Sequence, residues 1–147
     1  MRIVVVGCGY VGLVSGACLA GLGNTVVCVD ANPVKIAALN AGHCPIYEPG
    51  LDRLISQGRR AGRLFFTETM PEIGCDVDLV MIAVGTPPDR TGAADLSAIF
   101  AVAREIAAKA IDHALIVTKS TVPPGTGDAI ERIIRGARPQ IAVSVAS

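Results

Sequence analysis

Short apolar runs separated by turn residues recur along the whole chain. Residues 3–6, 25–30, 63–68, 78–85, 114–120 and 139–147 are rich in Val, Ile, Leu, Ala or Phe, and glycine, proline or asparagine lies close to each run. Runs of this length and composition are typical of strands buried inside a sheet. We therefore predict strands at these six places.

Apolar residues recur at helical spacing between these runs. Helices are predicted over residues 11–22, from Pro33 until Gly42, after Pro49, over residues 95–109 and over residues 123–136. The pair Asn32 and Pro33 matches the N-cap and the first position of a helix. Strands thus alternate with helices from one end of the chain to the other.

This alternation predicts βαβ units with right-handed crossovers and a parallel sheet. The expected fold class is α/β, a Rossmann-like doubly wound parallel sheet of about six strands with helices on both faces. The expected strand order is 3-2-1-4-5-6, although the pattern alone also permits other doubly wound orders. A length of 147 residues fits one domain, residues 1–147.

Composition and charge narrow the classes of partner. Thirteen basic residues balance thirteen acidic ones, so we expect neither nucleic acid nor an anionic membrane as a partner. The five cysteines show no C-x-x-C or histidine-paired spacing, which predicts no metal site and a reduced, cytoplasmic compartment. Six glycines within residues 7–23 interrupt the apolar start and argue against a targeting or inserting segment.

A glycine turn connects the first predicted strand to the first predicted helix. Gly7, Gly9 and Gly12 have G-x-G-x-x-G spacing at this junction. In a dinucleotide site the first glycine allows the tight turn, the second lets a pyrophosphate approach the backbone, and the third packs the helix on the strand. An ordinary strand–helix turn is the alternative, and the residue at the end of the second predicted strand decides between them.

Asp30 stands at the end of the second predicted strand, 23 residues after Gly7. This is close to the spacing of about 20 residues expected for an acid that hydrogen-bonds the adenosine ribose. A carboxylate there repels a 2′-phosphate, and Ala31 and Asn32 supply no arginine to hold one. NAD is therefore favoured over NADP, while FAD, which uses a similar fingerprint, remains a chemical competitor.

Polar residues come after the fourth and fifth predicted strands as well. Thr86 comes after one of them, and Ser120 and Thr121 come after the other. Ligands of doubly wound sheets bind beyond the carboxyl ends of the strands. Helix capping and turn formation explain Ser, Thr and Pro at these places equally well, so the spacing alone leaves both interpretations open.

Five segments in order give a more specific indication. They are "GYVGLVSGACLAGLGNTVVCVD", "YEPGL", "AVGTPP", "ADLS" and "TKSTVPPGTGD". Together they resemble the N-terminal half of the UDP-glucose/GDP-mannose dehydrogenase family, and the resemblance covers essentially the whole chain. It implies oxidation of the C6 alcohol of a nucleotide sugar to a carboxylate with two molecules of NAD. The lysine of "TKSTVP" favours UDP-glucose, while UDP-N-acetyl-hexosamines and GDP-mannose remain alternatives.

The resemblance also implies roles for individual residues. The glycine turn would hold the pyrophosphate, Asp30 and Lys35 the adenosine ribose side, and Ser120 and Thr121 the nicotinamide. Thr121 would additionally support catalysis by orienting the reacting water. The full cofactor-binding set is Gly7, Gly9, Tyr10, Val11, Gly12, Asp30, Lys35, Val84, Gly85, Thr86, Ser120 and Thr121.

The resemblance leaves out other parts of the family's chain. The nucleophilic cysteine, the central helix of the homodimer and the sugar-nucleotide domain would lie beyond Ser147, and none of the five cysteines stands in the nucleophile's motif. We therefore expect this chain to bind NAD without turning over a nucleotide sugar. A stand-alone NAD-sensing module is the alternative from another functional class.

Overall fold

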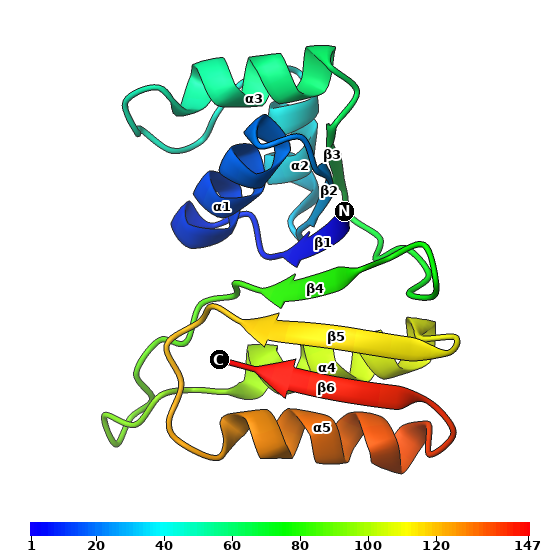
Figure 1. Cartoon of the computed structure of the whole chain (residues 1–147). Helices are drawn as coiled ribbons and strands as arrows, with labels where there is room; N and C mark the ends of the chain where they lie inside the picture. The colour runs from blue at the N-terminus through cyan, green and yellow to red at the C-terminus, as the bar shows by residue number, and fades with distance from the viewer.

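A six-stranded sheet crosses the molecule in the order β3-β2-β1-β4-β5-β6 (Figure 1). The computed structural model describes residues 1–147. Every neighbouring pair of strands is parallel. The predicted fold class and strand order are therefore confirmed. The strands are β1 (Arg2–Val6), β2 (Thr25–Val29), β3 (Leu64–Thr67), β4 (Leu79–Ile82), β5 (His113–Thr118) and β6 (Ala142–Ala146).

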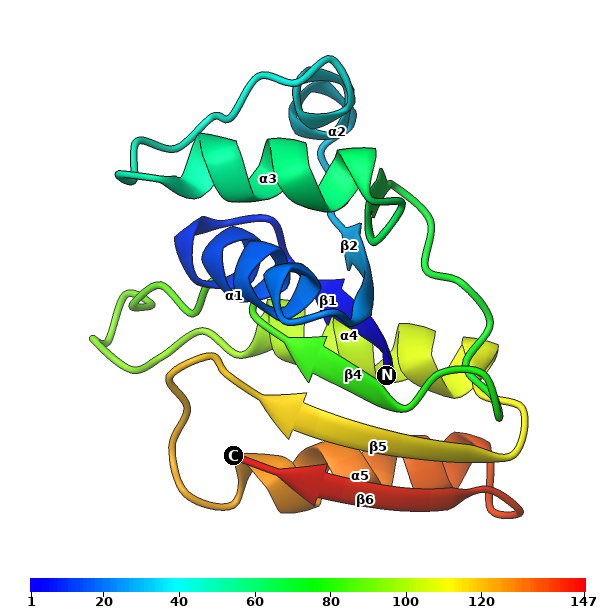
Figure 2. The ribbon, with the colours of Figure 1, turned by 45° about the horizontal axis from the view of Figure 1, so that its top comes forward.

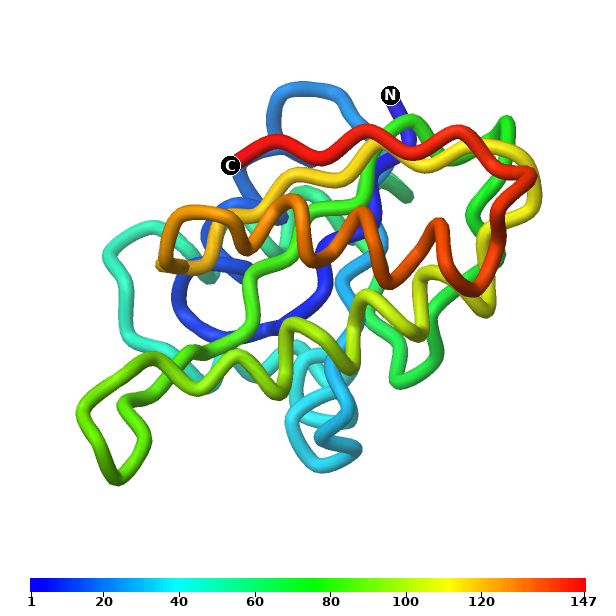
Figure 3. The backbone as a smooth tube through the Cα atoms, turned by 90° about the horizontal axis from the view of Figure 1, so that it is seen from below, coloured from blue at the N-terminus to red at the C-terminus, as the bar shows by residue number.

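Five helices cover the sheet, and each half of the chain uses a different face (Figure 2). Helices α1 (Tyr10–Gly21), α2 (Pro33–Asn40) and α3 (Leu51–Arg60) cover β1, β2 and β3. Helices α4 (Ser97–Lys109) and α5 (Thr126–Ala137) lie side by side on the opposite face, against β4, β5 and β6 (Figure 3). None of these helices combines the length and the hydropathy that crossing a membrane requires.

The sheet separates two hydrophobic cores, and β1 contributes to both. Its side chains alternate, so Ile3 and Val5 pack with α1, α2 and α3 while Val4 and Val6 pack with α4 and α5. All four are nearly or completely buried. Burial on both faces explains why this strand reads as an unbroken apolar run rather than as alternating apolar and polar residues.

Several element boundaries differ from the predictions; β5, for example, ends at Thr118 rather than Ser120, and β6 begins at Ala142 rather than Pro139. Helix α4 begins at Ser97 because Asp95 Oδ1 accepts a hydrogen bond from the Ser97 N–H, 2.9 Å away, and so caps the helix from outside. Helix α5 begins at Thr126 rather than Pro123, since Gly125 takes the left-handed conformation with φ +85°. Strand β4 ends at Ile82, and the following residues form a loop instead of continuing the ladder.

Candidate functional site

The loops after β1, β4 and β5 lie at one edge of the sheet, where the carboxyl ends of these neighbouring strands meet (Figure 1). This is the place where parallel α/β sheets bind ligands. Two adjoining cavities of about 300 Å³ and about 250 Å³ lie at this edge. Val84 lines both of them, so the end of β4 separates one from the other.

The glycine turn has the geometry that the sequence pattern predicts. Gly7 has φ +103°, and a Cβ there would lie 2.6 Å from the carbonyl oxygen of Ala83. A Cβ on Gly12 would lie 1.8 Å from the carbonyl oxygen of Gly7. Both positions therefore exclude any side chain, because the turn, α1 and the end of β4 are in close contact.

Gly9 has a different environment. It is the N-cap of α1, no side chain caps the helix, and the position of its missing Cβ has no neighbour within 4 Å. The first N–H groups of a helix have no partners inside the helix, and they carry a partial positive charge. An anionic group can therefore approach the backbone here, as a pyrophosphate must.

Asp30 lies directly after β2, and its carboxylate connects the glycine turn to α2. Oδ2 accepts hydrogen bonds from the Cys8 N–H at 2.8 Å and from Lys35 Nζ at 2.6 Å, while Oδ1 accepts from the Asn32 N–H at 3.0 Å. A carboxylate has about four lone-pair sites, so about one remains for a ligand hydroxyl. The residues present thus fit the ribose of a dinucleotide.

Two opposing influences act on the ionisation of Asp30. Partial burial works to raise its pKa, but the hydrogen bonds from Lys35 and from the Asn32 and Cys8 N–H groups outweigh it, and the net pKa is lowered. The group is therefore a stable anion at neutral pH. Asn32 in turn accepts hydrogen bonds from the Val34 and Lys35 N–H groups, which confirms it as the N-cap of α2.

The larger cavity at this edge, beside Asp30, is mainly apolar and is bordered by α4. Ala98 and Ala101 of α4 line it, and so do the acidic side chains of Asp30, Glu68 and Glu105. No lysine or arginine lines it. Three carboxylates, of which Asp30 is paired with Lys35, form a poor environment for a 2′-phosphate. The α4 residues and Glu68 were not predicted. Ala98 and Ala101, two small residues one helical turn apart at the start of α4, were a usable signal for a helix face that leaves room for a ligand.

Hydrogen bonds join the loops after β4 and β5, which border the second cavity. Ser120 Oγ donates to the Val84 carbonyl oxygen at 2.6 Å, and Thr86 Oγ1 donates to the Thr121 carbonyl oxygen at 2.9 Å. Both hydroxyls therefore have a structural partner as well as a place in the cavity wall. Thr121 itself is exposed there.

The predicted cofactor residues are brought together at this edge. Gly7, Asp30 and Val84 line the first cavity, and Gly9, Tyr10, Val11, Val84, Gly85, Thr86, Ser120 and Thr121 line the second. Gly12 is buried beneath the turn, and Lys35 acts on Asp30 through its ion pair. Lys119, the lysine of "TKSTVP", also lines the second cavity, although it was not in the predicted cofactor-binding set.

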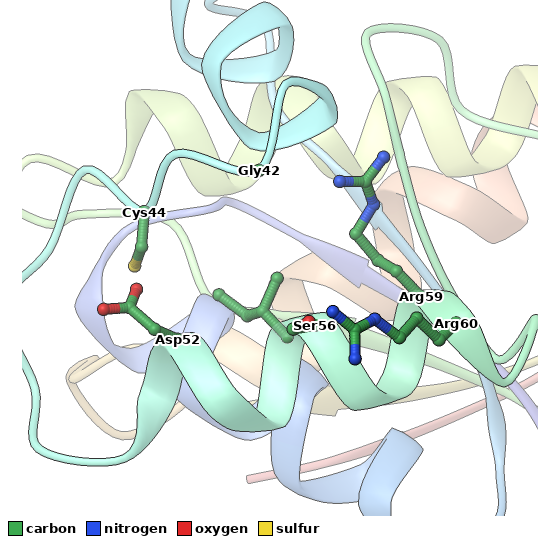
Figure 4. Close-up of a pocket in the computed structure, with 7 residues that line it drawn as sticks. Gly42, Cys44, Asp52, Ser56, Arg59 and Arg60 are labelled. Carbon is green, nitrogen blue, oxygen red and sulfur yellow. The ribbon is translucent and has the colours of Figure 1, made fainter.

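A third cavity of about 350 Å³ lies elsewhere, between the segment after α2 and the exposed side of α3 (Figure 4). Asp52, Ser56, Arg59 and Arg60 line it together with Cys44. None of the predicted cofactor residues is among its lining residues. Burial and the neighbouring Asp52 raise the pKa of the Cys44 thiol, which keeps it protonated and a poor nucleophile.

The remaining cysteines form neither a disulfide nor a metal-binding cluster. Cys8 and Cys28 are completely buried, and a hydrogen bond with Cys8 together with burial raises the pKa of Cys28 well above its usual value. All five thiols are free. No three His, Cys, Asp or Glu side chains lie together in an arrangement that could hold a metal ion.

Comparison with known proteins shows the family of this chain. The sequence profile of the UDP-glucose/GDP-mannose dehydrogenase family, NAD binding domain, matches residues 1–147. UDP-glucose 6-dehydrogenase of Rhizobium meliloti (strain 1021) is 53% identical over 148 residues, which cover 100% of this chain and 34% of that protein.

Two solved structures have the same fold. A UDP-glucose dehydrogenase from Pyrobaculum islandicum superposes with a TM-score of 0.90 at 40% identity, over 99% of this chain and 35% of that one. A GDP-mannose dehydrogenase from Pseudomonas aeruginosa superposes with a TM-score of 0.88 at 36% identity, over 99% of this chain and 35% of that one.

The chain thus spans about a third of the length of these relatives, 34% and 35%. The matching part of this chain contains the glycine turn, the acid after β2 and the polar loops after β4 and β5. The cofactor is NAD, because the NAD binding domain of the family matches the chain from end to end. The chain belongs to the UDP-glucose/GDP-mannose dehydrogenase family, and it is the NAD-binding domain of that family.

Proposed function

We propose that NAD lies along the carboxyl edge of the sheet, with its adenosine in the cavity beside Asp30 and its nicotinamide in the cavity beside Ser120 and Thr121. The observation that carries this proposal is the Asp30 carboxylate. It is ionised, held by three donors, and has capacity for about one more. A ribose hydroxyl is the donor that the adjoining cavity can bring to it.

The other residues of the edge bind the pyrophosphate and the nicotinamide. The open backbone at Gly9 and the N-terminus of α1 receive the pyrophosphate. The loops after β4 and β5 border the nicotinamide and shield one side of it from water. Bound NAD supplies the hydride acceptor. Thr121, exposed at the rim, is placed to orient a water molecule or a substrate hydroxyl.

We further propose that this domain serves the oxidation of a nucleotide sugar at C6, and that UDP-glucose is the first substrate to test. The supporting observation is the 53% identity with a protein named UDP-glucose 6-dehydrogenase. GDP-mannose is the second candidate, because a GDP-mannose dehydrogenase superposes with a TM-score of 0.88. None of the five cysteines lines either cavity at the cofactor edge. We therefore expect the chain alone to bind NAD without turnover.

We also propose a cellular compartment and an oligomeric state. The free cysteines support a reduced compartment, the cytoplasm. A homodimer is proposed for a polypeptide as long as the relatives, and it rests on the family resemblance. Sedimentation velocity on such a polypeptide, with this chain run beside it, tests the homodimer.

Isothermal titration calorimetry tests the cofactor site directly. The wild-type chain should bind NAD and bind NADP at least about tenfold more weakly, because the acidic cavity repels the 2′-phosphate. Asp30→Ala should lose about tenfold or more in NAD affinity, since it removes both the ribose acceptor and the support of the glycine turn. Asp76→Ala is the matched control, because this aspartate is exposed and pairs with Arg2 at the other end of β1.

Equal NAD affinity in the wild type and Asp30→Ala, or a preference for NADP, would overturn the cofactor assignment. Substrate choice needs a separate assay on a polypeptide that contains this domain and is as long as the relatives. NADH formation with UDP-glucose, UDP-N-acetyl-hexosamines and GDP-mannose is then compared. No NADH with any of the three sugars would overturn the proposed activity.

A further inference from the structure

No residue of the segment "YEPGL", residues 47–51, lines either cavity at the cofactor edge. It belongs to the connection between α2 and α3, and the ring of Tyr47 within it is 93% exposed. The third cavity lies beneath the start of this connection (Figure 4). Cys44 and Ile46 of the connection pack against the core that includes Leu51. Further contacts hold the end of the connection.

One of these contacts reaches the glycine turn. The Tyr10 hydroxyl donates a hydrogen bond to Glu48 Oε2, across 38 positions of sequence. Tyr10 is the first residue of α1, immediately after the open position at Gly9. Its ring is 53% exposed and lines the cavity proposed for the nicotinamide. A half-exposed ring with no partner would exchange between rotamers, and this hydrogen bond selects one of them.

The backbone of Glu48 is fixed from its C-terminal side. Pro49 restricts the preceding residue to extended conformations. The Glu48 carbonyl accepts a hydrogen bond from the Leu51 N–H at 3.1 Å, and Leu51 is only 2% exposed. Gly50, with φ +86°, makes the turn between them. The buried leucine thus anchors the short turn from which the Glu48 side chain extends toward Tyr10.

The ionisation of Tyr10 agrees with this contact. The hydrogen bond to Glu48 raises the pKa of the Tyr10 phenol above its usual value of 10.0, and the nearby negative charge of Glu48 acts in the same direction. Tyr10 therefore stays a hydrogen-bond donor throughout the neutral range. Its ring presents an uncharged edge to the cavity.

We propose that Glu48 is a positioning residue for the cofactor, which holds the Tyr10 ring as a preformed wall of the nicotinamide side of the site. The inference rests on the proposed function, because it assigns a task to a residue outside that site. It predicts that loss of Glu48 lowers the affinity for ligands that reach the nicotinamide side. Binding of ligands that occupy only the adenosine side is expected to be unaffected, because the hydrogen bonds of Glu48 go to Tyr10 and Leu51 and not to Asp30 or α4.

Affinities for NAD and for AMP test this prediction in Glu48→Gln, Tyr10→Phe and the double variant. Each single variant should bind NAD about threefold to tenfold more weakly and AMP within about twofold of the wild type. The double variant should lose no more than the larger single effect, because both changes remove the same hydrogen bond. Asp52→Asn removes a neighbouring charge that faces the third cavity, and it should bind both ligands normally.

A spectroscopic readout accompanies the titration. Phenolate absorbance near 295 nm should appear at lower pH in Glu48→Gln than in the wild type. The protein has only two tyrosines, so the Tyr10→Phe spectrum isolates the contribution of Tyr10. An unchanged ionisation midpoint in Glu48→Gln would show that the hydrogen bond does not exist in solution.

Equal loss of NAD and AMP affinity would assign Glu48 a general structural role and overturn the inference, and so would additive single effects. Normal NAD affinity in Glu48→Gln would also overturn it, provided that Asp30→Ala loses NAD affinity. Absence of NAD binding by the wild type would instead overturn the proposed function. Thermal unfolding of each variant verifies that all of them are folded.

Discussion

The two halves of the sheet support the same edge by different means. In the half formed by β1, β2 and β3, the edge is organised around one ionised group, Asp30, which accepts three hydrogen bonds. In the half formed by β4, β5 and β6, Ser120 and Thr86 donate to backbone carbonyls of the facing loop. The first arrangement depends on charge, and the second consists of neutral pairs.

This difference matches what each half would bind. A carboxylate that selects a ribose diol and repels a 2′-phosphate must be ionised and held in place. The nicotinamide ring is oxidised and reduced during turnover, and its surroundings must accept it both with and without positive charge. Neutral hydroxyl–carbonyl pairs supply shape without a fixed charge. Four substitutions test this contrast, beginning with the largest expected effect.

Gly12→Ala should have the largest effect, because the new Cβ would lie 1.8 Å from the carbonyl oxygen of Gly7. We expect about 3 kcal/mol or more of lost stability by urea denaturation, despite the better helix propensity of alanine. Gly9→Ala is the matched control, since its Cβ meets nothing within 4 Å, and it should cost less than about 1 kcal/mol. Similar losses in the two variants would refute the close approach of α1 to the turn.

Asp30→Asn should have the next effect, about 1–2 kcal/mol at pH 7, because charged hydrogen bonds are lost and the side chain is only 13% exposed. The pKa of Asp30 is lowered in the folded chain from its usual value of 3.8. Its stabilisation is therefore complete above that value and is lost as the pH falls through the lowered folded pKa. Urea unfolding of both proteins from pH 7 to pH 2.5 should show their difference shrinking toward the acid end, and a constant difference would contradict the role of charge.

Ser120→Ala removes the hydroxyl that donates to the Val84 carbonyl oxygen at 2.6 Å. We expect a loss of about 1 kcal/mol, the ordinary contribution of a neutral hydrogen bond. Because neither partner titrates, the loss should be the same at pH 4 and at pH 7. A strong pH dependence in this variant would remove the contrast between the two halves.

Glu131→Gln should have the smallest effect. Glu131 Oε1 and Arg135 Nε form an exposed i, i+4 pair on α5 at 2.7 Å. Such pairs contribute about 0.3–0.5 kcal/mol, and added salt reduces that contribution further. A loss above about 1 kcal/mol in thermal unfolding would show that charge also organises the second half of the chain.

Much of the architecture follows from short stretches of sequence. Each apolar run between glycines and prolines forms a strand, and Asn32 with Pro33 marks the start of α2. The boundaries of α4 and α5 were displaced, because Asp95 caps from outside the helix and Gly125 adopts a positive φ. These displacements depend on single side chains and single dihedral angles, which periodicity does not report.

The residues of the candidate site also fall into two groups, those that the sequence predicted and those that only the structure revealed. Motifs and the family resemblance predicted twelve cofactor residues, and ten of them line the two cavities at one edge. Motifs did not identify Ala98, Ala101, Glu68 and Glu105. Their contribution to a cavity depends on how α4 and the end of β3 are placed relative to the ends of β1 and β2. The Glu48–Tyr10 contact joins two motifs whose sequence separation conceals their proximity.

The sequence by itself determined the alternation of strands and helices, the glycine positions of the first turn and the acid that follows the second strand. These features depend on local sterics and on side-chain patterns within a few residues. Only the tertiary structure decided that the Cys8 N–H holds Asp30 and that Tyr10 contacts Glu48, 22 and 38 positions apart. The physical reason is that such contacts form only when parallel strands pair in one order and register, which brings distant chain segments to a common edge.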